Sequence, residues 1–447
     1  MGRMDVKALR RAVFVLAVAV GAGPARPAAA RGEADVLRED VQFLLEELPK
    51  KARDLLRDKD IDWKKATKSL AREAKKLRDP VEYVRLVERI LARLQDGHAG
   101  IVKLAPDLEA TLGAANEAEA KGRRFTGPRV HLVLAGDEVL VGEAFGEAAE
   151  AGVKVGMQVV EIDDVPARTW VEKKADELAD KNGYSTRHAA LHAACHWGLA
   201  TWEGTPIRFE LREGSDRKKV TITRRGGPNF APSGPACPPA DLKQVGRQSY
   251  GKTASGYGYI HLRDVPDKLP QQLDEMLGAL GDVPGLVLDM RANGGGGCDH
   301  EAVFGRFLAS GTRWRQYTGQ GAHPFTGPLV VIVDAGVRSA GETVAGMFKE
   351  DGRAYLIGPE PTAGMSSQKE ILEVPSGKLA VRVSVSSNKG RFNGGKGIEG
   401  LGVPPNEVVV YDAKELLAGT DSQIRRAEAL LRDGFPKGVV PYEPPAR

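Results

Sequence analysis

Ser339 lies where an apolar stretch gives way to helix-forming residues. Residues 328–333 have the apolar pattern of a buried strand, residues 334–338 have a turn-like composition, and helix formers resume over residues 340–348. This spacing predicts that Ser339 stands at the N-terminal end of a helix. Unpaired backbone N–H groups and the positive end of the helix dipole stabilise a developing oxyanion there. Serine is also a common helix N-cap, so the position alone leaves a purely structural role open.

Two other segments carry groups that acyl transfer requires. Residues 289–297 follow a second buried-strand pattern and end in four consecutive glycines. His98 lies far upstream, in the segment 96–99 at the end of a helical pattern. A serine hydroxyl is a weak nucleophile at neutral pH and needs a base, such as histidine, within hydrogen-bond reach. Together with Ser339, these segments therefore indicate a serine nucleophile, a histidine base and a glycine-rich loop.

In their order along the chain, these motifs resemble the C-terminal processing (tail-specific) serine peptidases and their tricorn-core relatives. The matching segments are residues 289–296, 339–342, 362–364 and 397–406, and the resemblance extends over residues 80–411. Each motif is weak by itself, whereas their ordered set is specific. The resemblance implies a serine peptidase that acts on peptide or unfolded protein chains.

The lysine base found in one branch of this family is missing from its expected place. Family members of the lysine type carry the lysine directly after a Thr-x-Gly turn, where this chain has Met365. A thioether cannot accept a proton at any useful pH. Lys369, four residues further on, is an alternative base for Ser339 if the turn is shifted.

The tricorn-type branch uses histidine, and His98 matches its position. The resemblance then implies Ser339 as the nucleophile, His98 as the general base and Glu399 as the carboxylate that orients it. Gly97 occupies the place of the serine that stands beside this histidine, so that hydroxyl is missing or supplied elsewhere. His98 could instead be a turn residue, and Glu399 could be a structural carboxylate.

The resemblance places the oxyanion hole on backbone N–H groups. Ala340, next to the nucleophile, would give one donor, and the Gly294–Gly295 turn would give the other. Glu342, in the first turn of the predicted helix, is expected to stabilise the helix dipole and to be structural. Arg338 could help to bind a carboxylate.

A cluster of histidines offers a competing metal site. His188, His192 and His196 follow one another at intervals of four residues on a predicted helix, with Cys195 adjacent. Histidines at this spacing can bind zinc. The flanking alanines suit simple packing better, and no glutamate lies between the histidines. We therefore expect no metal and no organic cofactor.

Residues 148–166 resemble the middle of a PDZ domain. A short helix runs into Gly152, Gly156 turns the chain, and an alternating strand follows. PDZ domains bind a peptide C-terminus by adding it as a strand to a sheet edge. The resemblance therefore implies that substrate chains are presented by their C-termini, and an ordinary β-sandwich is the alternative. Residues 170–199 are predicted to be an inserted helix or pair of helices.

These patterns together predict a multidomain α+β protein. Its expected parts are a signal peptide (residues 1–30), an N-terminal helical domain (31–105), a PDZ-like β-rich domain (128–226), a linker (227–250), a crotonase-like α/β serine peptidase domain (251–415), and a C-terminal helix and tail (416–447). The crotonase-like fold is implied by the family resemblance. The closing amphipathic helix is expected to run continuously over residues 413–433.

The N-terminus has the basic and apolar regions of a secretory signal, with small residues up to Ala30. The full chain has 64 basic and 60 acidic residues, and removing five and one of these with residues 1–30 leaves 59 of each. A formally neutral chain gives no reason to expect nucleic acid. We therefore expect a secreted or periplasmic protein without a stable membrane span, with peptides or unfolded proteins as its partners. The oligomeric state is left open.

Two other functions remain open at this stage. A binding or scaffolding protein could keep this architecture after losing turnover, which Gly97 and Met365 would explain. A hydrolase of non-peptide acyl groups would use the same chemistry, because an oxyanion hole serves esters as well as amides.

Overall fold

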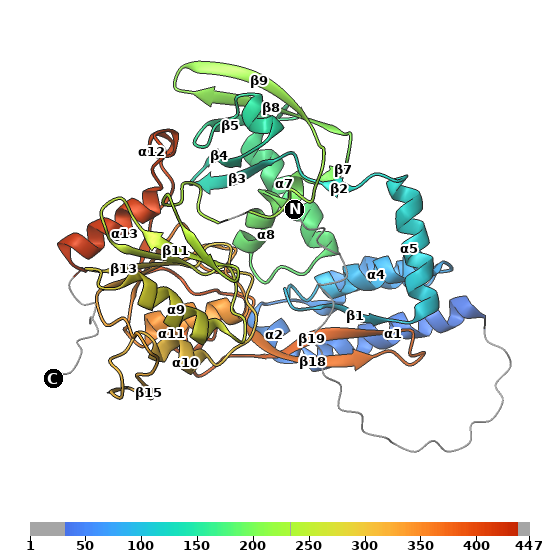
Figure 1. Ribbon diagram of the computed structural model, residues 1–447. Coiled ribbons are helices and arrows are strands. Elements are labelled where there is room, and N and C mark those ends of the chain that lie inside the picture. Colours follow the sequence, from blue (N-terminus) through green and yellow to red (C-terminus); the bar gives the residue numbers. More distant parts are fainter. Residues whose placement is uncertain (1–31, 233, 437–447) are drawn as a thin grey trace.

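A computed structural model describes residues 32–232 and 234–436 of the chain (Figure 1). The predicted signal peptide and the last residues of the predicted tail lie outside the described residues. The described chain is a mixed α/β protein with several separate sheets, as expected for a multidomain protein. Within it, no helix combines the length and the apolar character needed to cross a membrane.

The N-terminal part is helical, as predicted, and two of its helices, α3 and α4, begin at an aspartate that caps them. Asp79 accepts hydrogen bonds from the N–H groups of Val81 and Glu82, and Pro80 occupies the first position of α4, where its missing N–H costs nothing. The helices are α1 (Glu33–Lys51), α2 (Arg53–Asp58), α3 (Trp63–Ala74), α4 (Pro80–Ala92) and, after a short strand, α5 (Pro106–Ala120).

A strand pair from the C-terminal half of the chain packs beneath these helices. Figure 1 shows strands β18 and β19, in orange, beside the blue N-terminal helices. The apolar side chains of β19 share one core with those of α1 and α4. Buried Asp40 of α1 joins the two parts by accepting a hydrogen bond from the N–H of Ser376 at 3.0 Å. This three-stranded sheet has the order β1-β19-β18, with the bounds β1 (Gly100–Leu104), β18 (Ser367–Glu373) and β19 (Leu379–Ser387).

The middle of the chain forms a second sheet, of order β3-β4-β5-β8-β9, with β6 paired to β5. Two helices are inserted before β8, as predicted, and the N–H of Leu132 on edge strand β3 donates to Cys195 O, just past the second of them. The strands are β3 (Val130–Ala135), β4 (Glu138–Ala144), β5 (Gln158–Ile162), β6 (Val165–Pro166), β8 (Pro206–Glu213) and β9 (Asp216–Thr223), with a separate pair β2 (Phe125–Thr126) and β7 (Thr201–Trp202). The helices are α6 (Glu147–Glu150), α7 (Ala167–Lys181), α8 (Arg187–Ala194) and the 3-10 turn η2 (Trp197–Leu199).

The largest sheet has the order β10-β11-β12-β13-β16-β17-β20 and is parallel from β12 onward. Its central strands are buried along their whole length because helices cover both faces, which explains their continuous apolar runs. The strands are β10 (Lys243–Val245), β11 (Gln248–Lys252), β12 (Gly258–His261), β13 (Leu286–Asp289), β16 (Leu329–Ile332), β17 (Tyr355–Gly358) and β20 (Glu407–Val408).

Alternate residues of β13 enter two different cores. Leu286 and Leu288 face α9, α10 and α11, whereas Val287 faces α13. Asp289 at the end of β13 pairs with Ile332 of β16, so the segments that follow both strands emerge at one edge of the sheet. This edge is where parallel sheets place their ligand sites. The helices are α9 (Leu269–Leu280), α10 (His300–Gly305), α11 (Ala340–Glu350), α12 (Ala413–Leu417) and α13 (Ser422–Asp433), and short elements β14 (Arg313–Trp314), β15 (Tyr317–Thr318) and η3 (Asn393–Gly395) complete the domain.

Two predicted boundaries differ from the structure. The expected linker over residues 227–250 is shorter, because β10 already begins at Lys243 and Tyr250 of β11 packs in the main core. The single helix expected over residues 413–433 is two helices, α12 and α13. Gly419 has a φ of +76°, which ends α12, and the side chain of Asp421 caps a new helix.

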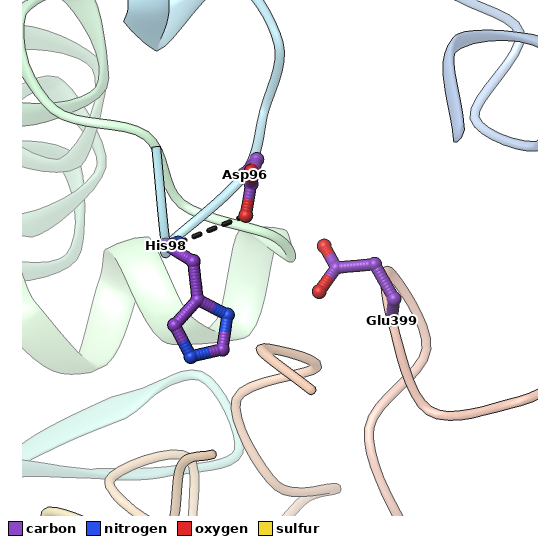
Figure 2. Close-up of side chains that lie close together, drawn as sticks. All are labelled: Asp96, His98 and Glu399. Carbon is purple, nitrogen blue, oxygen red and sulfur yellow. Dashed lines mark hydrogen bonds between the residues drawn. The ribbon is translucent and has the colours of Figure 1, made fainter. Parts of the chain in front are cut away.

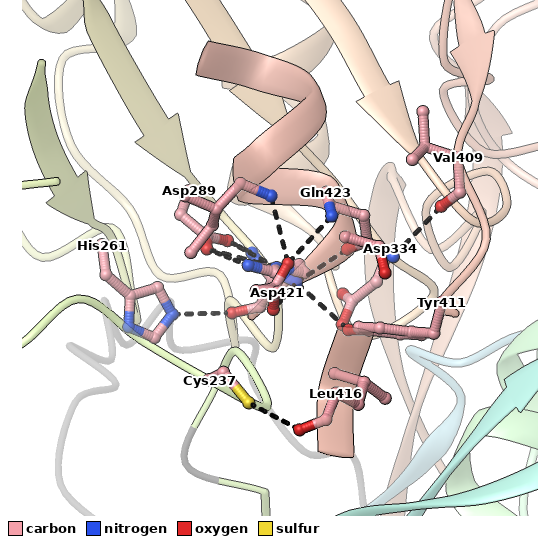
Figure 3. Close-up of polar contacts among 12 residues, drawn as sticks. Cys237, His261, Asp289, Asp334, Val409, Tyr411, Leu416, Asp421 and Gln423 are labelled. Atoms are coloured by element: carbon pink, nitrogen blue, oxygen red, sulfur yellow. Dashed lines mark hydrogen bonds and ion pairs between the residues drawn. The ribbon is translucent and has the colours of Figure 1, made fainter. Parts of the chain in front are cut away.

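A buried arginine holds the end of β13 against the start of α13 (Figure 3). Arg291 is fully buried and pairs with Asp289 and, at 2.8 Å, with Asp421. It also donates to Gln423 at 2.7 Å and to the hydroxyl of Tyr411 at 3.1 Å. Because the glycine-rich segment begins just after Arg291, this network determines where that segment starts.

Candidate active site

Ser339 lies at the N-terminal end of α11, as the sequence predicts. Its backbone has φ 56° and ψ −123°, a conformation that costs a non-glycine residue roughly 1–3 kcal/mol. The N–H of Ser339 is held by two acceptors, the carbonyl of Met365 and the carboxylate of Glu342, each at 3.0 Å. The surrounding structure therefore keeps the serine hydroxyl at the mouth of the helix.

Glu342 is the centre of that support. Its buried carboxylate accepts the hydroxyl of Thr362 at 2.6 Å, the N–H of Gly364 at 2.6 Å and the N–H of Met365 at 2.8 Å, in addition to the N–H of Ser339. The prediction of a structural role is therefore confirmed. Its function is broader than dipole stabilisation, because it ties the nucleophile's backbone to the turn at residues 362–365.

His98 reaches the serine across 241 positions of sequence. Its Nε2 lies 3.2 Å from Ser339 Oγ, and the imidazole is only 5% exposed. Its Nδ1 lies 3.3 Å from the hydroxyl of Ser367, which lies 2.5 Å from the hydroxyl of Ser384. If Nδ1 carries the proton and donates it to Ser367, the lone pair of Nε2 faces Ser339. This arrangement has the geometry of a nucleophile, its base and an orienting hydroxyl.

Ser367 is the orienting hydroxyl that sequence reasoning missed. It comes from the start of β18, directly after the turn that Glu342 holds, and the hairpin of β18 and β19 carries it under the N-terminal helices. Gly97, which the resemblance to the tricorn-type branch placed where that branch has a serine, cannot supply a hydroxyl. The only signal in the sequence was the Ser366-Ser367 pair just after that turn.

Glu399 lies near the histidine without bonding to it (Figure 2). One polar atom each of Asp96, His98 and Glu399 lies within 4.8 Å of the others. Glu399 Oε1 is paired with Lys59 Nζ at 2.7 Å, and its carboxylate is fully buried. The predicted orienter thus lies close to His98 but not in contact with its ring, and the direct partner of Nδ1 is Ser367.

Asp96 shapes the loop that carries the histidine. One of its oxygens accepts the N–H of His98 at 2.8 Å, and the other accepts the N–H of Ser384 at 2.9 Å (Figure 2 draws the first of these). Both carboxylate oxygens of Asp96 therefore have partners, as does Oε1 of Glu399. Asp96 is therefore a hydrogen-bonded support for the loop of His98, whereas Oε2 of Glu399 is buried without a hydrogen-bond partner among the described residues.

Burial is the main cause that lowers the pKa of His98 to about 4. The positive charge of Lys369 adds to this lowering, the carboxylate of Asp96 opposes it, and Arg382 adds a smaller lowering effect. The imidazole is consequently neutral at pH 7, which is the form that accepts a proton. Lys369 itself has an exposed side chain on β18, two residues after Ser367. It makes no hydrogen bond to Ser339, whereas His98 does.

The glycine donors predicted for the oxyanion hole are already used. The N–H of Gly294 donates to Arg263 O at 3.0 Å, and that of Gly295 donates to Asn293 Oδ1 at 2.9 Å. A backbone N–H that is bonded inside the protein is not available to a substrate. The prediction of these two donors is therefore wrong, although the segment itself lies where it was expected.

Two neighbouring backbone groups remain available instead. Within residues 32–232 and 234–436, the N–H groups of Ala340 and Gly296 have no hydrogen-bond acceptor. Gly295 packs so closely against the nucleophile that an added Cβ would lie 2.8 Å from Ser339 Cβ. Only glycine fits at that position, so the glycine-rich loop can lie directly against the serine.

Comparison with known proteins agrees with this geometry. Residues 256–409 match peptidase family S41. The carboxyl-terminal-processing protease of a Synechocystis strain is 24% identical over 378 residues, covering 80% of this chain and 79% of that protein. Residues 256–409 therefore form a domain of the peptidase family S41 type. The chain is a serine peptidase similar to the C-terminal processing proteases, in which bacterial and chloroplastic proteins occur.

Coverage of the relatives varies. A chloroplastic carboxyl-terminal-processing peptidase of Arabidopsis thaliana is 28% identical over 198 residues, which is 41% of this chain but only 36% of that protein. The crystal structure of mature CPAF shares the fold of this chain, with a TM-score of 0.64 at 13% identity, and the match covers 91% of this chain and 99% of that one.

The three histidines that offered a competing metal site make packing and backbone contacts instead. His188 Nε2 lies 2.7 Å from Thr362 O, and His196 Nδ1 lies 3.0 Å from Phe230 O. The rings of His192 and His196 lie edge to face, with centroids 4.9 Å apart. In the part of the chain that the structure describes, the three histidines do not bring their nitrogen atoms together as metal ligands.

Proposed function

We propose that the chain is a serine endopeptidase that cleaves peptide or unfolded protein chains through an acyl-enzyme on Ser339. The observation that carries this proposal is the contact of 3.2 Å between His98 Nε2 and Ser339 Oγ at the N-terminal end of α11. Ser339 Oγ attacks the peptide carbonyl while His98 Nε2 takes its proton. The N–H groups of Ala340 and Gly296 would donate to the resulting oxyanion.

The collapse of this intermediate completes acylation. The C–N bond breaks as His98 gives its proton to the leaving amine, which is the new N-terminus of the released C-terminal fragment. The N-terminal fragment stays bound through its carbonyl carbon to Ser339 Oγ as an ester. Water then attacks the ester, His98 takes a proton from that water, and the serine leaves with the same proton. Ser367 keeps His98 in the productive tautomer throughout.

Presentation of the substrate by its C-terminus through residues 128–226 is part of this proposal. The N–H of Leu132 on the outer edge of β3 is already bonded to Cys195 O, so an added strand would have to pair beyond that point or displace it. Export after cleavage near Ala30 is likewise inferred from the sequence alone, and N-terminal sequencing of the protein recovered from cells would test it.

Degradation of an unfolded protein by the purified full-length chain tests the peptidase activity. Fragments identified by mass spectrometry should disappear with Ser339→Ala and His98→Ala and persist with Lys369→Ala. Loss of fragments with Lys369→Ala alone would make the lysine the base. No fragments from the folded wild-type chain would favour a binding or scaffolding role, and turnover of esters without peptides would favour a different hydrolase.

A further inference from the structure

A cavity of about 300 Å³ opens directly beside the catalytic pair. Its wall includes Gly97, next to the base, and Met365, whose carbonyl accepts the N–H of the nucleophile. The opposite side is built by the inserted helices α7 and α8 and the loop between them. Much of the lining is apolar, with side chains from Leu178, Tyr184, Ala193, Trp197, Ala363 and Met365.

Arg338 brings the permanent charge of this cavity. It directly precedes Ser339, and the only hydrogen bond of its side chain within the described residues is a long one, 3.5 Å from Nε to Gly336 O. No aspartate or glutamate is among the residues that line the cavity, and no described carboxylate forms an ion pair with Arg338. The other basic residues of the wall, His192 and His196, are neutral because burial lowers the pKa of each.

A partly buried guanidinium without a counter-ion is suited to an anionic ligand. Its planar group can give two parallel hydrogen bonds to one carboxylate, and such bonds gain strength where water is largely excluded. The apolar wall around it offers burial to a hydrocarbon side chain at the same time. A peptide chain bound at Ser339 could reach both the guanidinium of Arg338 and the apolar wall.

We propose that this cavity is a substrate subsite that takes an apolar side chain together with a carboxylate of the substrate, which Arg338 binds. This inference rests on the proposed peptidase function and specifies its substrates. The carboxylate can come from the C-terminus of the chain or from an acidic side chain near the scissile bond. The subsite favours substrates in which such a group lies close to an apolar residue.

Binding to the full-length Ser339→Ala protein tests the subsite without turnover. Dye-labelled peptides are compared by fluorescence anisotropy in matched pairs: a free C-terminal acid against its amide, and an internal glutamate against glutamine. We expect the charged member of at least one pair to bind about tenfold tighter or more, as a charge-assisted hydrogen bond would produce. The pair that shows the difference identifies the source of the carboxylate.

Three further changes, each added to Ser339→Ala, localise the effect. Arg338→Gln should abolish the preference, and Arg338→Lys should retain part of it, because a lysine keeps the charge but loses the bidentate geometry. Arg217→Gln, which removes an exposed arginine from the distant β8–β9 hairpin, should change nothing. A preference that survives Arg338→Gln would place carboxylate recognition elsewhere and overturn the proposal, as would equal binding of both members in both pairs.

The apolar wall has its own test. Trp197, which is 42% exposed and stacks on Phe230, lines the cavity, whereas Trp202 on β7 does not. Trp197→Ala should weaken binding of a peptide with leucine or phenylalanine more than of one with serine, and Trp202→Ala should weaken neither. Equal losses for all peptides would contradict the apolar subsite. Wild-type protein that binds selectively but never cleaves would count against the peptidase proposal alone.

Discussion

A Cβ atom added to Gly97 would lie only 2.7 Å from the sulfur of Met365. Gly97 departs from the tricorn-type pattern and Met365 from the lysine-type pattern, and the structure makes them neighbours. Met365 fills the space that a serine side chain at position 97 would need. A serine side chain at position 97 and the present side chain of Met365 would therefore compete for the same space, and Ser367 lies where it can bond to the histidine.

Restoring the family serine should therefore harm this protein. Gly97→Ser forces its side chain into Met365 and should displace His98, which lowers kcat/KM and costs roughly 1–3 kcal/mol of stability. Shortening the neighbour in Gly97→Ser/Met365→Ala should recover much of both. Gly113→Ser on α5, where an added Cβ meets nothing within 4 Å, is the control for a new serine. Full activity in the single variant would show that the packing conflict is not real.

Ser367→Ala should lower kcat more than it raises KM. It removes the partner of His98 Nδ1, and the loss of one such hydrogen bond corresponds to roughly a tenfold decrease. Steady-state kinetics on a peptide substrate measure it, with Ser215→Ala in the exposed β8–β9 turn as the control. An unchanged kcat would show that Ser367 does not orient His98 for catalysis, and Glu399 would then be the next candidate for that role.

The acid side of the pH profile should reflect the environment of His98. Because burial and neighbouring cations lower its pKa to about 4, the neutral base persists well below the ordinary histidine value. The fall of kcat/KM with decreasing pH should thus begin below pH 6.5. Lys369→Met removes a positive charge that lowers this pKa, so it should move the fall to higher pH without abolishing activity. Circular dichroism at each pH shows whether the protein is still folded.

A shift in the opposite direction, or none, would mean that Lys369 does not act on His98. Complete inactivity of Lys369→Met at every pH would instead support the lysine as the base. The variant therefore separates two mechanisms as well as testing one electrostatic effect.

Arg291→Met should be among the most destabilising substitutions in the main sheet. It leaves the buried carboxylates of Asp289 and Asp421 without their counter-ion, which typically costs about 3–5 kcal/mol. Urea denaturation measures the change, with Arg432→Met on the exposed end of α13 as the control. Equal midpoints for the two variants would show that the network adds nothing to stability.

The sequence alone determined the local features of the site. An apolar run followed by a turn and helix formers predicts a helix start at Ser339, because helix and strand periodicities are properties of neighbouring residues. The replacement of the usual lysine by Met365 excluded that base from its usual place, and the order of the motifs identified the family. The sequence also predicted the paired helices before β8 and the alternation of strands and helices after residue 256.

Only the tertiary structure decided which groups meet. Ser367 reaches His98 because the β18–β19 hairpin leaves the peptidase sheet to pack under the N-terminal helices, a contact between distant segments that no local pattern encodes. That the N–H groups of Gly294 and Gly295 are bonded inside the protein depends on the path of the loop backbone, which no local pattern encodes. The cavity beside Arg338 exists because the inserted helices fold back over the turn at residues 362–365. Periodicity is local, whereas hydrogen-bond partners and cavities are made by chain segments that only folding brings together.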